Sequence, residues 1–178
     1  MNENLGCNFY LATHPKFQSC GEIESNRRFE LCRGNIVIRT FIENDLFSVM
    51  QIWLDTNIKA HSFIPQNYWT DNYAMVKDIL PQAEIYVSED DNTNQIDGFI
   101  GLTNNYVEGI FVSEAIQSKG IGKQLLNYAK EIKSSLTLSV YQKNTRAIAF
   151  YQREQFVIRS VNINDSTNEK EFIMTWSK

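Results

Sequence analysis

Hydrophobic residues along the chain recur with two different periods, which predict an alternation of strands and helices. The β-branched run Ile36-Val37-Ile38 predicts a first strand. Asn44 and Asp45 then offer an N-cap for a helix whose apolar positions follow at intervals of three and four residues: Leu46, Val49, Met50, Trp53 and Leu54. A second helix is expected after a loop, with Tyr68, Met75, Val76 and Ile79 as its apolar positions and Pro81 at its end.

The middle and the end of the chain predict a sheet interrupted by two further helices. Strands are expected over 84–87, 95–103 and 106–112, and the turn sequences between them predict a meander. Further on, the pattern predicts helices over 119–133 and 144–155, and strands over 136–141, 156–163 and 172–176. The resulting order of elements, β-α-α-β-β-β-α-β-α-β-β, predicts the α/β class, with a mixed, twisted central sheet flanked by helices.

The first 34 residues lack this periodicity, so we expect an N-terminal extension, loosely ordered, followed by one domain over 35–178. All three cysteines of the chain, Cys7, Cys20 and Cys32, lie in this extension. Their number and spacing fit neither a closed disulfide set nor a zinc site, even with His14 as a further ligand. The expectation is therefore that the protein binds no metal.

Composition and charge narrow the function without naming it. The 178 residues are 43% hydrophobic and 12% aromatic, which is enough to build a core and excludes disorder as the main state. No apolar run approaches the roughly 18 residues of a membrane span, and no signal peptide begins the chain, so we expect a cytoplasmic protein with no membrane partner. The net charge of −4 argues against a nucleic-acid partner and suits a cationic acceptor such as an amine.

The segment Gln117-Ser118-Lys119-Gly120-Ile121-Gly122-Lys123 carries the sharpest chemical indication. It follows an apolar strand and opens an amphipathic helix, where uncovered backbone N–H groups and the helix dipole favour an anion such as a phosphate. The Walker A pattern is absent, and so is the third glycine of the dinucleotide fingerprint. A glycine-rich helix start without a ligand is the alternative for this segment taken alone.

A second motif follows on the next helix and changes the interpretation. The Q-x-x-G-x-G loop, then a strand, then Asn144, Ala147 and Phe150-Tyr151 together resemble the GNAT superfamily of N-acetyltransferases. The resemblance covers about Ile36 to Trp176. The run 140–144, the loop 61–64 and the terminal run 173–176 are most similar to the small bacterial YiaC/YjaB group.

This resemblance implies an acetyl-CoA site. In such proteins the pyrophosphate lies on backbone amides of the loop that matches Gln117, Ser118, Lys119, Gly120, Ile121, Gly122 and Lys123, and the pantetheine arm lies beside the strand that matches Ile110, Phe111 and Val112. The residue matching Asn144 contacts that arm, and the one matching Tyr151 faces the thioester sulfur. A phenol, whose pKa is ordinarily about 10, can protonate a departing thiolate. Whether Lys119 and Lys123 help to hold phosphate, or are simply solvated lysines, is left open.

The acceptor side is less specific. Glu108 could deprotonate the incoming ammonium as a general base, or could be a solvent-facing strand residue. His61 lies in a loop that lines the acceptor channel of similar proteins, where it could position the acceptor or relay a proton, or it could be a loop histidine bonded to backbone. Phe63, Tyr68 and Trp69 could wall the acceptor pocket, whereas Trp53 is expected in the core.

One position departs from the family pattern. Gln155 stands before Phe156, where similar proteins usually have a glycine that caps the last helix in the left-handed conformation. Glutamine there is expected to cost about 1 kcal/mol or to require another cap.

The function expected from this reasoning is acetyl transfer from acetyl-CoA to a primary amine, by direct attack in a ternary complex and without a metal. The acceptor could be a protein or a small molecule, and the sequence leaves the oligomeric state open. Two alternatives remain at this point: a non-catalytic acyl-CoA sensor, and a toxin-type acetyltransferase that modifies aminoacyl-tRNA.

Overall fold

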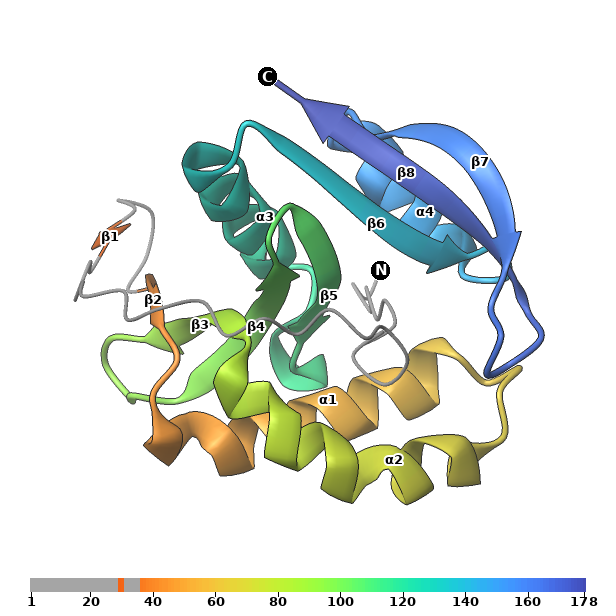
Figure 1. Ribbon diagram of the computed structural model, residues 1–178. Coiled ribbons are helices and arrows are strands. Elements are labelled where there is room, and N and C mark those ends of the chain that lie inside the picture. Colours follow the sequence, from red (N-terminus) through yellow and green to blue (C-terminus); the bar gives the residue numbers. More distant parts are fainter. Residues whose placement is uncertain (1–28, 31–35) are drawn as a thin grey trace.

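The computed structural model describes residues 29–30 and 36–178. Within them the chain forms eight strands and four α-helices, joined in places by 3-10 turns (Figure 1). The elements in chain order are β1 (Phe29–Glu30), β2 (Ile36–Thr40), η1 (Glu43–Asp45), α1 (Leu46–Ala60), α2 (Gln66–Ile79), η2 (Leu80–Gln82), β3 (Glu84–Asp90), β4 (Ile96–Thr103), β5 (Tyr106–Val112), η3 (Glu114–Ile116), α3 (Ile121–Ile132), β6 (Ser135–Tyr141), α4 (Thr145–Arg153), β7 (Val157–Ile163) and β8 (Lys170–Ser177).

All the strands belong to one sheet in the order β1-β2-β3-β4-β5-β6-β8-β7. Strands β1 to β5 pair antiparallel, as the predicted meander requires, and β6, β8 and β7 form a second antiparallel group. The two groups meet at β5 and β6, which run parallel and pair at only two positions, Tyr106 with Thr137 and Val107 with Leu138. The predicted mixed sheet is confirmed, and its two halves share a very short seam.

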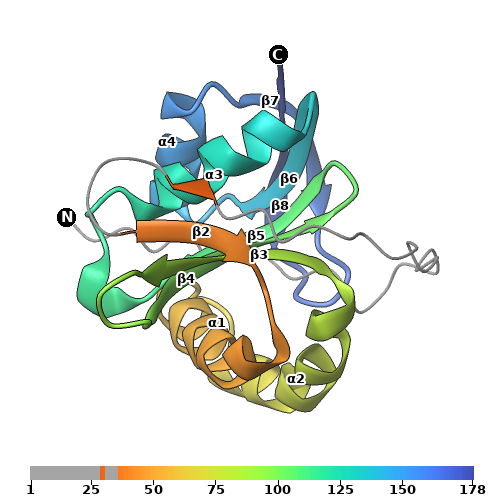
Figure 2. The same cartoon turned by 90° about the vertical axis from the view of Figure 1, so that its left-hand side faces the viewer.

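Helices cover both faces of the sheet, so the chain builds two buried clusters. Helices α1 and α2 lie together on one face, and α3 and α4 lie on the other (Figure 2). The α3 cluster contains side chains from both halves of the sheet, including Ile100 on β4, Leu138 on β6 and Met174 on β8. The α1–α2 cluster contains Trp53, whose side chain is 1% exposed, and this confirms its expected place in the core.

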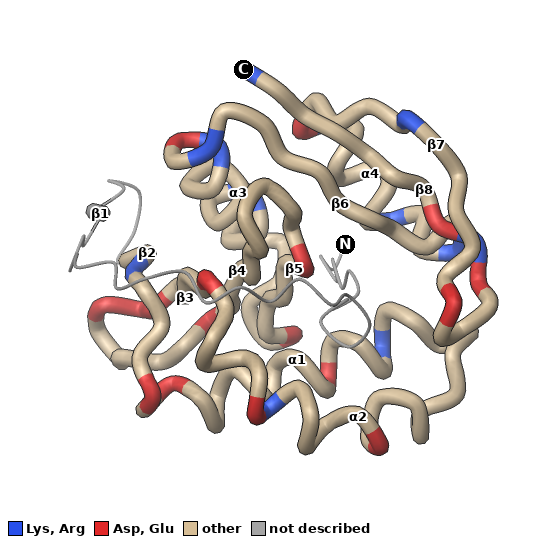
Figure 3. The backbone as a smooth tube through the Cα atoms, viewed as in Figure 1, with Lys and Arg blue, Asp and Glu red and all other residues tan. Residues whose placement is uncertain are grey.

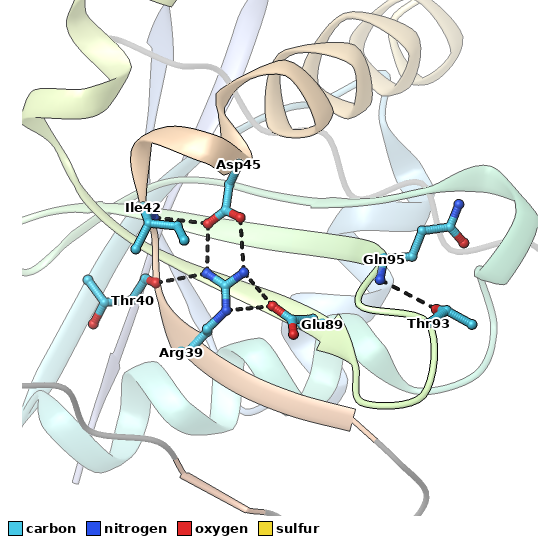
Figure 4. A network of polar contacts seen from close by, with 7 residues as sticks. All are labelled: Arg39, Thr40, Ile42, Asp45, Glu89, Thr93 and Gln95. Atoms are coloured by element: carbon cyan, nitrogen blue, oxygen red, sulfur yellow. Dashed lines mark hydrogen bonds and ion pairs between the residues drawn. The ribbon is translucent and has the colours of Figure 1, made fainter.

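Asp45 is the N-cap residue of α1, as expected, but it does not cap the helix with its side chain. Its carboxylate instead accepts a hydrogen bond from the Ile42 N–H at 2.9 Å, across the preceding 3-10 turn. The same carboxylate receives two hydrogen bonds from Arg39, at 2.7 and 2.9 Å (Figure 4). Arg39 also donates to Glu89 on β3 at 2.6 Å. Arg39 therefore joins β2 to β3 and to the start of α1.

Part of the sequence-based expectations falls on the extension. Its two described residues, Phe29 and Glu30, pair with β2 and add an edge strand that the sequence pattern did not predict. Cys7, Cys20, Cys32 and His14, and the expected loose order of the rest of the extension, lie outside the described residues. Within the described ranges, no helix has the length and hydrophobicity that crossing a bilayer would need.

Candidate functional site

The backbone between β5 and α3 has a conformation suited to an anion. Ser118 and Gly120 have φ angles of 68° and 85°, both in the left-handed region, and Gly120 is the N-cap of α3. The first N–H that bonds to a carbonyl within the helix is that of Gln124, which reaches the Gly120 carbonyl at 3.1 Å. The amides of Gly120, Ile121, Gly122 and Lys123 therefore precede the helical hydrogen bonds and are the donors that helix N-termini offer to anions.

Side chains fix this loop to the end of β5. Gln117 is buried, and its amide nitrogen donates to the Val112 carbonyl at 3.1 Å. Its side chain thus holds the loop in place. Lys119 and Lys123 are both exposed at the helix start, and Lys123 pairs with Glu154 at 3.1 Å. Both lysines add positive charge beside the free amides.

A carboxyl group lies close to this loop on the neighbouring strand. Burial is the main reason that the pKa of Asp97 on β4 is raised above its usual value, and the negative charge of Asp90 adds to it. Lys119 opposes this shift, which shows that its charge is felt at Asp97. Elsewhere in the described part of the chain, Lys and Arg are spread over several elements and interleaved with Asp and Glu, without a continuous basic track (Figure 3).

Strands β5 and β6 separate beyond their short seam. No register pair joins them after Val107 and Leu138, although β5 continues to Val112 and β6 to Tyr141. The side chains of Ile110, Phe111 and Val112 are fully buried, so this stretch presents its backbone, rather than its side chains, to the space between the strands. A splayed strand edge can bind the amide groups of an extended ligand as an added strand would.

Glu108 lies where the two strands begin to separate. On β4, Gly101 pairs with Gly109 and Leu102 pairs with Val107, so Glu108 is the extra residue of a β-bulge. Its side chain is 5% exposed, so it is not the solvent-facing strand residue of the alternative interpretation. Bulges redirect side chains and occur often beside active sites.

Asn144 and His61 meet across the molecule at the open end of β6. Asn144 precedes α4 as its N-cap, and its side-chain oxygen accepts from the Ala147 N–H at 3.1 Å. Its amide nitrogen lies 3.5 Å from Nε2 of His61. Because an amide nitrogen only donates, Nε2 is the acceptor in this contact, and the proton of a neutral His61 lies on Nδ1.

His61 is completely buried among aromatic rings. Its ring stacks on Trp69 with centroids 5.3 Å apart and meets the edges of Tyr141 and Phe63 at 5.1 and 5.7 Å. Phe63 in turn contacts Tyr141 at 5.5 Å. These four side chains, which we call the aromatic wall, bring the end of α1, the start of α2 and the end of β6 together.

A hollow of about 400 Å³ lies on the other side of Phe63. It is formed by the start of α2 and by the turn between β7 and β8, which contributes Ser166 and Thr167. Of the four residues expected on the acceptor side, Phe63 and Tyr68 line this hollow. His61 and Trp69 belong to the buried aromatic wall behind it.

Tyr151 lies in the core beneath α4. Its side chain is fully buried and packs between Phe150 and Phe156, with ring centroids 5.2 and 5.5 Å away. It belongs to the buried cluster that also contains Val112, the last residue of β5, and Ile121, the first residue of α3. Tyr151 therefore packs on the same face of the sheet as the start of α3.

The sequence did not single out the polar groups around the hollow. Tyr141, Asn164, Thr167 and Asp71 are separated by many residues in the chain, and no local pattern links them. They come together because β8 inserts between β6 and β7. Among the residues of 29–30 and 36–178, no group of three or more histidines, cysteines or carboxylates could hold a metal ion.

A mixed sheet whose central parallel strands separate, with a helix start that exposes backbone amides after the first of them, is typical of the acyl-CoA-dependent N-acetyltransferase class. Comparison with known proteins agrees. Residues 81–158 match the acetyltransferase (GNAT) domain family. The peptidyl-lysine N-acetyltransferase YiaC of Escherichia coli is 34% identical over 142 residues, which are 79% of this chain and 96% of YiaC.

Solved structures show the same fold. The apo form of YjaB from Escherichia coli superposes with a TM-score of 0.71 at 22% identity, over 79% of this chain and 97% of YjaB. The yncA acetyltransferase of Salmonella typhimurium, solved with its cofactor acetyl-CoA, has a TM-score of 0.59 at 16% identity, over 81% of this chain and 94% of yncA. The chain belongs to the GNAT family of N-acetyltransferases, so the predicted fold and enzyme class are confirmed.

Proposed function

We propose that this protein transfers the acetyl group of acetyl-CoA to the side-chain amine of a lysine in a protein. The observation that carries this proposal is the parting of β5 and β6 immediately before a helix start with free amides. Two curated relatives, YiaC and the YjaB of Salmonella typhimurium, are named peptidyl-lysine N-acetyltransferases, which favours a lysine among the possible amines.

The residues present fit acetyl-CoA at two points. The amides of Gly120 to Lys123, with Lys119 and Lys123 beside them, suit the charge of the pyrophosphate. The backbone of Ile110 to Val112, which lacks a β6 partner, suits the two amide groups of the pantetheine arm. Acetyl-CoA supplies the thioester whose acyl carbon the amine attacks.

Asn144 is placed to orient the pantetheine end. Its side-chain oxygen accepts from the Ala147 N–H, which fixes the plane of the amide group and turns its nitrogen toward the open end of β6, where it is to donate to a carbonyl of the ligand. His61, 3.5 Å from that nitrogen, limits how far it can turn. In this arrangement His61 is a positioning residue that acts through Asn144.

The acceptor nitrogen loses two protons in the reaction, and the leaving thiolate gains one. Glu108, at the bulge where the strands part, takes the first proton from the acceptor ammonium, directly or through water, so that the neutral nitrogen can form the new C–N bond. The C–S bond breaks, the phenol of Tyr151 gives its proton to the leaving thiolate, and the second proton of the nitrogen returns to the Tyr151 oxygen and restores the phenol. The amine attacks directly, and the chain forms no covalent intermediate.

The binding step is tested by a valine at the helix start. Gly122→Val places a branched side chain over the free amides, so acetyl-CoA should raise the thermal midpoint of the wild type and leave that of the variant unchanged. Asn127→Val puts the same residue in the middle of α3 and controls for its helix propensity. If Gly122→Val folds poorly, Gly122→Ala gives the same comparison with a smaller side chain.

The outcomes separate the proposal from its alternatives. An equal acetyl-CoA response in wild type and both Gly122 variants would show that the phosphate loop is assigned to the wrong segment. Binding without thiol release from any lysine peptide would support a non-catalytic sensor. Thiol release in the presence of a lysine peptide, with a matching mass increase of that peptide, is the expected result.

A further inference from the structure

The hollow beside the aromatic wall carries a negative charge that no side chain lining it neutralises. Asp71 on α2 is the one carboxylate that lines it, and no lysine or arginine does so. Within the described ranges Asp71 takes part in none of the ion pairs, which involve other carboxylates such as Glu114 and Glu169. A carboxylate left exposed in a concave site attracts a cationic group of a ligand.

Aromatic rings beside Asp71 suit the same kind of ligand. Phe63 and Tyr68 both line the hollow, and a cation over an aromatic face is attracted by the ring. Phe63 already shows this behaviour, because the ammonium of Lys143 lies 5.3 Å from its ring centroid. That lysine is in turn held by Glu169, with its nitrogen 2.7 Å from the carboxylate. Lys143 is thus occupied, and it does not line the hollow.

Hydrogen-bond acceptors complete the lining. Asn72 donates from its amide nitrogen to the Tyr68 carbonyl at 2.6 Å, which leaves its amide oxygen as an acceptor. The N-terminus of α2 also faces the hollow and would favour an anion, but its partial charge of about half a unit is smaller than the full charge of Asp71. The balance of charge in the hollow therefore favours a cation.

The floor of the hollow is held by a chain of polar contacts. The hydroxyl of Thr167, which lines the hollow, donates to the Asn164 side-chain oxygen at 3.1 Å, so Tyr141 is the donor in its 3.2 Å contact with Thr167. Asn164 donates to the buried Glu171 at 3.1 Å. This chain fixes the β7–β8 turn against the aromatic wall, so the hollow has a defined shape.

The hollow lies one layer of rings from the expected reaction centre. Phe63 lines it, His61 contacts Phe63, and His61 Nε2 lies 3.5 Å from the Asn144 nitrogen. An acceptor that places a neighbouring group in the hollow must therefore extend around these rings from its reacting amine near Asn144. Its volume of about 400 Å³ falls in the range of small-ligand sites, about 300–1,000 Å³.

We propose that this hollow binds a second positive charge carried by the acceptor, with Asp71 as its counter-ion and the rings of Phe63 and Tyr68 beside it. This inference rests on the proposed transfer to an amine and adds a preference among amines. In a protein acceptor, the second charge is a lysine or arginine near the modified lysine. In a small-molecule acceptor, it is a second ammonium of a diamine.

The test compares acceptors that differ only in this charge. One arm uses lysine peptides with arginine or glutamine at each of three positions on either side, and the other compares 1,5-diaminopentane with 1-aminopentane. We expect the wild type to prefer the doubly charged acceptor in one arm by about threefold to tenfold in kcat/KM, a range typical of an exposed ion pair with an aromatic contribution. The preference should decline with added salt.

Variants on α2 assign the preference to Asp71. Asp71→Asn should reduce it to less than twofold, whereas Asp78→Asn removes the same charge from an exposed position of α2 outside the hollow and should retain it. Asp71→Lys should reverse it in favour of a peptide with glutamate in place of arginine. An equal preference in wild type and Asp71→Asn, or none in either arm of the wild type, would overturn the inference.

A binding measurement separates this inference from the proposed function. Dissociation constants are measured in the presence of CoA for peptides whose lysine is already acetylated. Those of 1,5-diaminopentane and 1-aminopentane are measured by direct titration, so that no turnover is needed in either case. If binding depends on Asp71 but no acceptor is acetylated, the result supports the hollow as a site for a positive charge and rejects the proposed amine transfer. If acceptors are acetylated but neither binding nor rate depends on Asp71, the result rejects the hollow as a cation site and is consistent with the proposed acetyl transfer.

Discussion

Gln155 occupies a backbone conformation that suits glycine. Its φ is 68°, and two bonds close the end of α4 around it, from the Phe156 N–H to the Tyr151 carbonyl at 2.9 Å and from the Gln155 N–H to the Gln152 carbonyl at 3.0 Å. This is a Schellman motif, completed by the contact of Tyr151 with Phe156. The left-handed cap expected from the sequence is confirmed, with glutamine in the place of glycine.

We expect Gln155→Gly to stabilise the protein by about 1 kcal/mol, because glycine relieves the left-handed strain and loses part of that gain as chain entropy. For a chain of this size the thermal midpoint should rise by roughly 2–4 °C, measured by calorimetry. Gln155→Ala is the matched control, because alanine keeps the strain. A glycine variant no more stable than the alanine variant would contradict this account.

The proposed general-acid role of Tyr151 is tested by a substitution that removes only the phenol oxygen. Tyr151→Phe keeps the packing against Phe150 and Phe156, so a loss of activity would report on the phenol alone. If the phenol protonates the thiolate, kcat should fall by about 10², with acetyl-CoA affinity little changed. Tyr128→Phe removes a phenol from another tyrosine of the same buried cluster and should keep its turnover.

The contrary outcome has a simple meaning. The alternative role for Tyr151, whose side chain is fully buried, is to pack against the sulfur end of the cofactor. A Tyr151→Phe enzyme with more than about a third of the wild-type turnover would reject the general-acid role, since one positioned acid is worth more than that.

Residue positions were predictable where a motif is local. The loop from Gln117 to Lys123 and the Asn144 cap each occupy a short stretch, and the structure places them at the two helix starts that the pattern implied. Asp71 was missed because its importance depends on the distant Thr167 and Phe63. Asp45 was correctly placed at the N-cap of α1, but the sequence did not show that its carboxylate binds Arg39 and makes no capping bond to the helix.

At the scale of elements, the end of β5 is set by how closely β4 approaches it. A Cβ atom added at Gly98 on β4 would lie 2.5 Å from the Phe111 carbonyl oxygen and 3.1 Å from the Val112 Cα. Both are backbone atoms, so they cannot move aside without shifting the strand. Glycine at this position therefore allows β4 to pair closely with the last residues of β5, which precede η3 and the loop from Gln117 to Lys123.

We expect Gly98→Ala to lower the free energy of unfolding by about 1–3 kcal/mol through this overlap, as measured by urea denaturation. Gly120→Ala is a useful contrast, because an added Cβ meets nothing within 4 Å there and the cost comes from its φ of 85° alone. Gly98→Ala should also weaken the acetyl-CoA response. A loss of stability below about 0.5 kcal/mol would show that β4 and β5 adjust easily.

The positions of the strands and helices followed from the periodicity of the sequence, but which strands pair with each other did not. Strand β7 was predicted from its apolar residues, yet every one of its positions is exposed, because it lies at the sheet edge beyond β8. The insertion of β8 between β6 and β7 is a long-range pairing that no local pattern encodes. Strand β1 was not predicted for a different reason, because a strand of two residues is too short to display a period.

On the scale of the whole molecule, the two halves of the sheet pair at two positions, and both buried clusters contain side chains from the two halves. The α3 cluster is the broader of these contacts, with side chains from β2, β4, β5, β6, α4 and β8 around α3. The helix whose first amides face the expected pyrophosphate therefore also helps to hold the halves together. Damage to the middle of α3 would reduce stability and cofactor binding at once.

The hollow beside Asp71 lies outside this joint. None of the residues that line it belongs to α3, β4 or β5, since they come from the start of α2 with its preceding loop and from the β7–β8 turn. Substitutions there can alter which acceptor is favoured without moving the backbone that the cofactor needs. A sheet divided in this way lets acceptor choice diverge between related enzymes while the acetyl donor stays the same.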